Sequence, residues 1–153
     1  TPQVLYDTPC NLFVAGFIGS PQMNFLDATC KVNGNKVALE VGGAAIELPP
    51  AKAKKLIEGG YDGKTVVLGI RPEDVHDEPM FIASSPNTVI ESKIRVYEML
   101  GAEVYLYFDY AGSSMTARVD PRTTARTGDT VKFAFDAEKI HVFDKETECT
   151  ITN

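Results

Sequence analysis

The tripeptide Gly63-Lys64-Thr65 resembles the end of a phosphate-binding loop. The complete loop needs a second glycine five residues before Gly63, where this chain has Glu58. It also needs a following helix whose N–H groups point at the phosphate, but the residues after Lys64 are the β-branched run of a strand. We therefore interpret the tripeptide as a hairpin turn.

The run from Glu73 to Glu78 contains His76 and enough carboxylates to suggest a metal site or an acid/base pair. No second histidine lies near it and its spacing is not that of a zinc site, so we predict a solvated loop. The other histidine, His141, stands among apolar residues and is predicted to be half-buried in a strand. Neither histidine forms a recognisable pair with a serine or cysteine, so nucleophilic catalysis has no support.

Tyr105 and Tyr107 alternate with apolar residues, which places two rings on the polar side of one strand. Such rings could stack on a base or a sugar, or could form cross-strand pairs or a protein interface. Fifteen Lys and Arg against 21 Asp and Glu give a net charge of −6, which disfavours nucleic acid as a partner. The three cysteines form no closely spaced pair, which fits a reducing, cytosolic setting.

Two short helices are predicted before residue 22. The second, Leu12 to Ile18, is apolar around nearly its whole circumference, so we expect Leu12, Phe13, Phe17 and Ile18 to dock on something outside the chain or between two halves of it. This apolar stretch of seven residues is the longest in the chain and is far short of the ~20 that span a bilayer. No transmembrane helix is therefore expected.

From Met23 onward, short β runs alternate with turn signals. One small helix, which begins at Pro49-Pro50 and ends at Gly59-Gly60, is expected to plug a barrel. Ser84 to Asn87 is the best internal linker. The predicted strands are Phe25 to Val32, Lys36 to Val41, Ala44 to Leu48, Thr65 to Ile70, Met80 to Ala83, Val89 to Leu100, Glu103 to Tyr110, Met115 to Val119, Thr130 to Phe135 and Ile140 to Phe143.

A weak internal repeat appears when the chain is shifted by 65 residues, because Gly63 to His76 then aligns with Gly128 to His141. Each copy reads as a strand, a tight bend carrying an acid, and a return strand. This pattern indicates two similar half-barrels, although common turn residues could also coincide by chance. The fold class is thus mainly β, an OB-like barrel that could consist of two half-barrels, with short N-terminal helices and one small internal helix.

Several segments resemble the ATP-binding subunits of bacterial ABC sugar importers of the maltose and multiple-sugar type. They are Thr1 to Pro9 with Asn11 to Phe25, Leu68-Gly69-Ile70-Arg71-Pro72-Glu73, Glu98 to Glu103, and His141-Val142-Phe143-Asp144 followed by Thr147. The resemblance implies that residues 1–22 are tail helices and a linker of an ATPase domain, and that residues 23–153 are a TOBE (transport-associated OB) regulatory domain. The phosphate-binding loop, the signature motif and the catalytic residues of the ATPase are absent, so ATP and magnesium would belong to a domain outside this chain.

The resemblance implies a non-catalytic regulatory and dimerisation domain that forms a homodimer in the cytoplasm. Its parent would lie on the inner face of the membrane, would contact permease subunits and could receive a regulatory protein. A single-stranded nucleic-acid or oligosaccharide binding module and a small metal-assisted hydrolase are the alternative readings; no cofactor is expected in the fragment, and the transported sugar stays open. The candidate regulatory and interface residues are Arg71, Pro72, Glu73, Glu98, Gly101, His141, Phe143 and Asp144.

Overall fold

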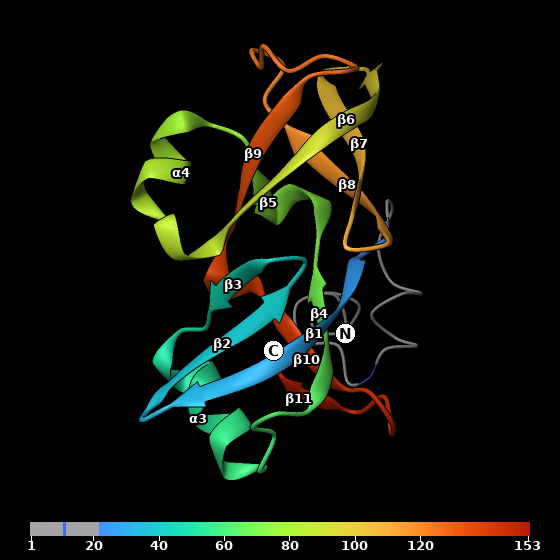
Figure 1. The fold of residues 1–153 in the computed structure, drawn as a ribbon. Helices are drawn as coiled ribbons and strands as arrows, with labels where there is room; N and C mark the ends of the chain where they lie inside the picture. Colours follow the sequence, from blue (N-terminus) through green and yellow to red (C-terminus); the bar gives the residue numbers. More distant parts are fainter. Residues whose placement is uncertain (1–10, 12–21) are drawn as a thin grey trace.

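The computed structural model describes Asn11 and residues 22–153 of the chain. The predicted docking helix with Leu12, Phe13, Phe17 and Ile18 lies outside the described residues, and so does Cys10. Asn11 itself forms an isolated antiparallel β-bridge with Cys149. The described residues form two sheets, one below the other in Figure 1.

The first sheet has six strands in the order β11-β10-β4-β1-β2-β3. All of its pairs are antiparallel, and hairpins join β1 to β2 and β2 to β3. The strands are β1 (Asn24–Asn33), β2 (Lys36–Val41), β3 (Ala44–Glu47), β4 (Thr65–Ile70), β10 (His141–Asp144) and β11 (Thr150–Thr152).

The second sheet has five strands in the order β5-β9-β6-β7-β8, again all antiparallel. The strands are β5 (Val75–His76), β6 (Val89–Leu100), β7 (Glu103–Tyr110), β8 (Ser113–Val119) and β9 (Thr130–Phe135). The predicted mainly β fold is confirmed. Strand β11 was not predicted, because three residues carry no readable alternation, and β5 was predicted only as the return strand of the repeat.

The sequence repeat corresponds to a structural one. A shift of 65 residues places β4 on β9 and the 3-10 turn Pro72–Asp74 on the 3-10 turn Ala137–Lys139. The strand after each turn is exchanged, because β5 pairs with β9 of the second sheet while β10 pairs with β4 of the first. The registers correspond, with His76 opposite Ala134 and His141 opposite Gly69. The chain therefore consists of two half-barrels with the same topology, and each contributes one strand to the sheet of the other.

The polar side chain of Asn24 also joins the two sheets. Its amide Nδ2 donates to the carbonyl oxygen of Thr116 at 2.8 Å, and the Thr116 N–H donates back to Asn24 Oδ1 at 2.8 Å. Thr116 lies on β8, which is an edge strand, and Asn24 is 5% exposed. The amide thus satisfies backbone groups that an edge strand would otherwise leave unpaired.

Two helices interrupt the strands. Helix α3 (Pro50–Glu58) forms where the small internal helix was predicted, starts with a proline, and buries Lys52, Ala53 and Leu56. Helix α4 (Pro79–Ser84) replaces the predicted strand Met80 to Ala83, and none of its residues is buried. The strand prediction was wrong because four apolar residues fit either element, whereas Pro79 fits the first turn of a helix and decides the matter.

The segment Glu73 to Glu78 is also more ordered than predicted. It was expected to be a solvated loop, but it contains the end of the turn Pro72–Asp74 and strand β5, in which Val75 is fully buried. His76 stacks on the ring of Phe81 in α4, with 4.0 Å between the ring centroids. Its Nδ1 also lies 3.3 Å from a Glu78 carboxylate oxygen. The acidic residues of this segment therefore lie in the turn before β5 and just before the start of α4.

One hydrophobic core extends through both sheets, from Leu26 and Leu68 in the first to Phe108 and Phe133 in the second. The rings of Phe108 and Phe133 stack with centroids 4.4 Å apart. A smaller cluster of Met23, Val67 and Phe143 lies on the other face of the first sheet. A shared main core means that the two half-barrels stabilise one another.

Candidate functional site

The two 3-10 turns meet where the exchanged strands begin. In the first bend, Ile70 ends β4, Arg71 is extended with ψ of 151°, and Pro72 opens the turn. In the second bend, the Asp136 carboxylate accepts a hydrogen bond from the Glu138 N–H at 3.2 Å and caps the turn. The Asp136 N–H donates to the carbonyl oxygen of Asp74 at 2.9 Å, so a main-chain hydrogen bond joins the two bends.

These bends surround a cavity of about 300 Å³, which we call the two-bend cup. Arg71 and His141 are 3% and 6% exposed and form its buried part, whereas Glu138 and Lys139 are exposed at the rim. His141 Nδ1 lies 3.0 Å from Asn153 Oδ1. The residues that line the cup are Arg71, Glu73, Asp74, Glu138, Lys139, His141 and Asn153.

The structure thus brings together four of the eight candidates, Arg71, Pro72, Glu73 and His141, from two segments that are far apart in sequence. Pro72 is buried and sets the turn rather than lining the cavity. His141 is more deeply buried than the half-buried position predicted for it. The partners Glu138 and Lys139 were missed as site residues, although the 65-residue repeat placed them opposite Glu73 and Asp74.

Burial makes the carboxyl group of Asp74 a weaker acid than usual. Desolvation, together with the nearby charges of Glu73 and Asp136, raises the pKa of its carboxyl to about 6, and Lys139 and Arg71 only partly oppose this. Near the second bend, burial lowers the pKa of Lys52 in α3 although the charges of Glu138 and Asp136 act to raise it. At both groups, the loss of hydration therefore shifts the pKa more than the neighbouring opposite charges do.

Replacing Asp74 with its neutral isostere in Asp74→Asn should stabilise the fold above pH 6, because it removes a carboxylate charge that the native state disfavours. The expected gain is about 1 kcal/mol, a small value because the group is only partly buried and solvent screens it. The raised pKa means that the native state holds the Asp74 proton more tightly than the unfolded chain. The wild-type penalty is therefore full above pH 6 and disappears below the ordinary value of 3.8. Denaturant unfolding at pH 7.5 and pH 4 checks this, with exposed Glu40→Gln as the control; an equal effect at both pH values would contradict it.

Asp144 and Phe143 have structural positions next to the cup rather than in it. Phe143 is fully buried and its ring meets that of Phe25 at 72° with centroids 6.2 Å apart. Asp144 Oδ1 accepts hydrogen bonds from the N–H groups of Glu146 and Thr147, which closes the turn that leads to β11. These contacts give a physical reason for the spacing between Asp144 and Thr147 in the sequence.

The other Asp144 oxygen accepts a hydrogen bond from the Tyr61 hydroxyl at 2.7 Å. The turn N–H groups and this hydroxyl lower the pKa of Asp144 to about 2. The same hydrogen bond raises the pKa of Tyr61 to about 12, because it favours the protonated phenol. Asp144 therefore fixes the β10–β11 turn against the loop after α3.

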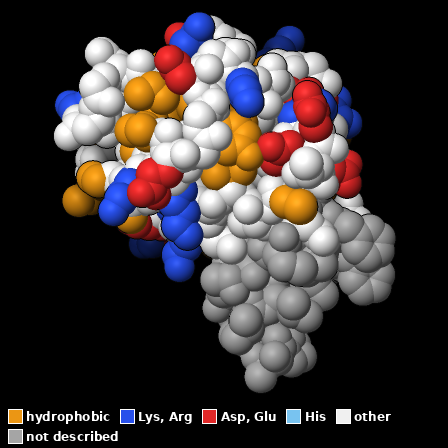
Figure 2. Space-filling view, turned by 90° about the horizontal axis from the view of Figure 1, so that it is seen from below, with side chains coloured by type: hydrophobic (Ala, Val, Ile, Leu, Met, Phe, Trp, Pro, Cys, Tyr) orange, Lys and Arg blue, Asp and Glu red, His pale blue; other side chains and the backbone are white. Residues whose placement is uncertain are grey.

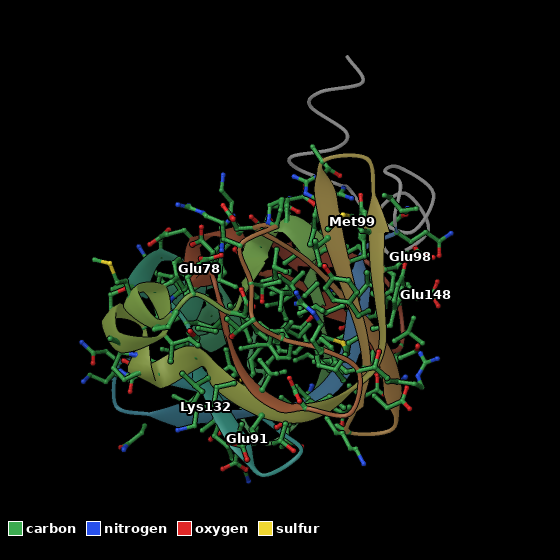
Figure 3. All side chains as sticks on the ribbon, turned by 90° about the horizontal axis from the view of Figure 1, so that it is seen from above. Glu78, Glu91, Glu98, Met99, Lys132 and Glu148 are labelled. Atoms are coloured by element: carbon green, nitrogen blue, oxygen red, sulfur yellow. The ribbon has the colours of Figure 1, made fainter. Side chains whose placement is uncertain are left out.

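Glu98 and Gly101 lie on the β6–β7 hairpin, apart from the cup. The Tyr107 hydroxyl donates to Glu98 Oε1 at 3.0 Å, and Gly101 has a φ of 62°, which allows the tight turn. Met99 and Leu100 beside the turn are 56% and 53% exposed. Figure 3 shows Glu98 and Met99 on the opposite side of the view from Glu78. Their predicted interface role stays a prediction.

A second, larger cavity of about 1170 Å³ lies between α4 and the segment that joins β8 to β9. Its apolar wall includes Ile82, Ala125 and Val131, and Asp77 at its edge accepts a hydrogen bond from the Thr123 hydroxyl. Sequence reasoning missed this groove, because it predicted a strand where α4 stands.

In the part of the chain that the structure describes, no three His, Cys, Asp or Glu side chains are placed to hold a metal ion together. Within the same residues, no helix is long and apolar enough to cross a membrane. On the face that contains α3, positive and negative side chains intermingle around small apolar patches (Figure 2).

Two protein-family models match the chain in adjacent segments that overlap slightly. A model described as the MalK OB fold domain matches residues 19–75, and a model described as the TOBE domain matches residues 68–143. Each match covers one half of the duplicated structure. The chain thus belongs to the MalK-type OB and TOBE domain family.

The chain is also similar along its length to curated proteins. It is 44% identical over 99% of its length to the oligosaccharides import ATP-binding protein MsmX of Bacillus subtilis, and 40% identical over 99% to the multiple sugar-binding transport ATP-binding protein MsmK of Streptococcus mutans. A trehalose/maltose import ATP-binding protein MalK of Thermococcus litoralis is 37% identical over 96%. The chain spans only about two fifths of the length of these relatives, 40%, 39% and 39% respectively.

Among solved structures, the cytoplasmic molybdate-binding protein ModG has a similar fold. The TM-score is 0.57 at 14% sequence identity, and the match covers 82% of this chain and 96% of ModG. At that identity the likeness concerns the fold alone.

Proposed function

We propose that this chain is the regulatory and dimerisation domain of the ATP-binding subunit of an ABC carbohydrate importer. The observation that carries the proposal is the 44% identity with MsmX along almost the entire chain. In this proposal the domain holds two subunits together in the cytoplasm, at the inner face of the membrane, while separate ATPase domains bind the permease subunits. It can also present a surface to a regulatory protein.

The arrangement of the described residues supports a role without catalysis. The cup contains an arginine, a histidine and carboxylates, but no serine, cysteine or threonine nucleophile lines it. Gly63 lies in a turn, and its N–H donates a hydrogen bond to the carbonyl oxygen of Cys30. Lys64 then leads into strand β4 and not into a helix, so no helix N-terminus is available there to bind a phosphate. The domain therefore needs ATP and magnesium only through the ATPase domain to which it is attached.

The purified chain should neither bind nor hydrolyse ATP. Release of phosphate from ATP with magnesium, together with fluorescence of a labelled ATP analogue, tests this expectation, and full-length MsmX serves as the positive control. Turnover that copurifies with the chain and persists after a second purification step would contradict the non-catalytic role.

The nucleic-acid alternative is not supported by the two tyrosines that suggested it. The Tyr105 hydroxyl donates to Glu103 at 2.8 Å and the Tyr107 hydroxyl donates to Glu98, which puts a carboxylate beside each ring. Tyr105 is only 8% exposed. Arg118 lies opposite Tyr105 and pairs with Glu103 at 3.8 Å, so the carboxylates of Glu98 and Glu103 outnumber the one arginine beside the two rings. A phosphate backbone would gain little attraction there, and charge attraction is the main source of affinity for single strands.

A further inference from the structure

We propose that the two-bend cup binds one small, neutral, polyhydroxylated molecule about the size of a monosaccharide. The proposal goes beyond the dimerisation role and does not depend on it. Two polar side chains, Arg71 and His141, are more than nine-tenths buried where they line the cup. Both have interaction partners within the chain, so the side chains are fixed before any ligand arrives.

The size of the cup limits the ligand. Its volume of about 300 Å³ lies at the lower end of the range for small-molecule sites. The exposed rim residues Glu138 and Lys139 leave the cup accessible from solvent. A single small molecule can enter, whereas a nucleotide or an extended peptide would exceed the space.

The charges of the lining select against ions. An anion would face the carboxylates of Glu73, Asp74 and Glu138, and a cation would face Arg71 and Lys139. Neutral hydroxyl groups fit this mixed set, because each can donate to a carboxylate and accept from a guanidinium, an ammonium or the Asn153 amide. Neighbouring hydroxyls on one ring can satisfy both kinds of group at once.

The position of the cup gives such a ligand an effect on the fold. One wall comes from the bend between β4 and β5, and the other comes from the bend between β9 and β10. The ligand would span both bends beside the hydrogen bond from the Asp136 N–H to the Asp74 carbonyl. Binding would therefore add a contact between the half-barrels and stabilise the folded chain.

Titrations of the intact chain with D-glucose, D-galactose and myo-inositol, followed by amide and histidine-ring NMR shifts, test the proposal. At least one of the three should give saturable shifts centred on His141, Glu138 and Lys139. Glu138→Gln and Lys139→Met should each weaken that binding roughly tenfold, as expected for the loss of one hydrogen bond to a charged group. Both variants alter exposed rim residues, so the fold is retained, and the exposed pair Glu40→Gln and Lys36→Met on β2 is the matched control.

Sulfate and choline, titrated in the same way, provide the charged comparison. The proposal is overturned if none of the three polyols gives saturable shifts, if the rim variants bind as tightly as the controls, or if sulfate or choline saturates the same resonances at equal or lower concentration. None of these outcomes bears on whether the chain dimerises or hydrolyses ATP, so the proposed function is tested separately.

Discussion

Cutting the chain between Ser84 and Ser85 is expected to give two fragments that do not fold alone but fold when mixed. Each fragment loses the strand that completes its sheet, because β5 pairs with β9 and β10 pairs with β4 (Figure 1). The main core also contains residues from both fragments. Separation would leave two open sheet edges and expose apolar side chains in both fragments.

Circular dichroism melts and the dispersion of amide NMR signals check this expectation for residues 1–84, residues 85–153 and their equimolar mixture. Only the mixture should show dispersed signals and a cooperative transition. A cooperative melt of either fragment alone would mean that the half-barrels are independent, and would contradict the exchanged topology.

Gly69→Val should destabilise the fold by about 3 kcal/mol, at the upper end of the cost of overpacking a core. A Cβ atom built on Gly69 would lie 2.6 Å from Met23 Sδ and 3.0 Å from Phe143 Cε2, and both of these residues are buried. Gly69→Ala should cost less, because the thioether of Met23 can move, whereas the added methyl groups of valine also meet the Phe143 ring.

Urea unfolding of both variants measures the effect, and Thr65→Val at the exposed start of β4 is the control for substitution in the same strand. A loss below 0.5 kcal/mol for Gly69→Val, within the range of ordinary surface changes, would show that the small cluster of Met23, Val67 and Phe143 rearranges freely.

Most strands could be predicted from the sequence because turn residues mark their ends. Gly34 and Asn35 separate β1 from β2, and Gly101 separates β6 from β7, so the limits follow from local backbone chemistry. Helix α4 could not be predicted in the same way, because its apolar run is short and is not buried on one face. Hydrophobic periodicity alone does not distinguish a strand from a helix in such a case, although Pro79 fits the first turn of a helix.

The candidate site was only half predictable for a different reason. Arg71 and Glu73 were predicted as site residues because they belong to a family motif. Glu138 was not predicted as one, although it aligns with Glu73 in the weak repeat. The exchange of β5 and β10 brings the two copies together, and a strand exchange is a tertiary property that leaves no local signal. Likewise, the burial that raises the pKa of Asp74 depends on both bends at once.

Sedimentation equilibrium of the purified chain over a wide concentration range tests the central claim most directly. The account of the chain as a dimerisation domain predicts a reversible monomer–dimer equilibrium, with the mass rising from 16.7 kDa toward twice that value. A single species of 16.7 kDa at every concentration would contradict the account.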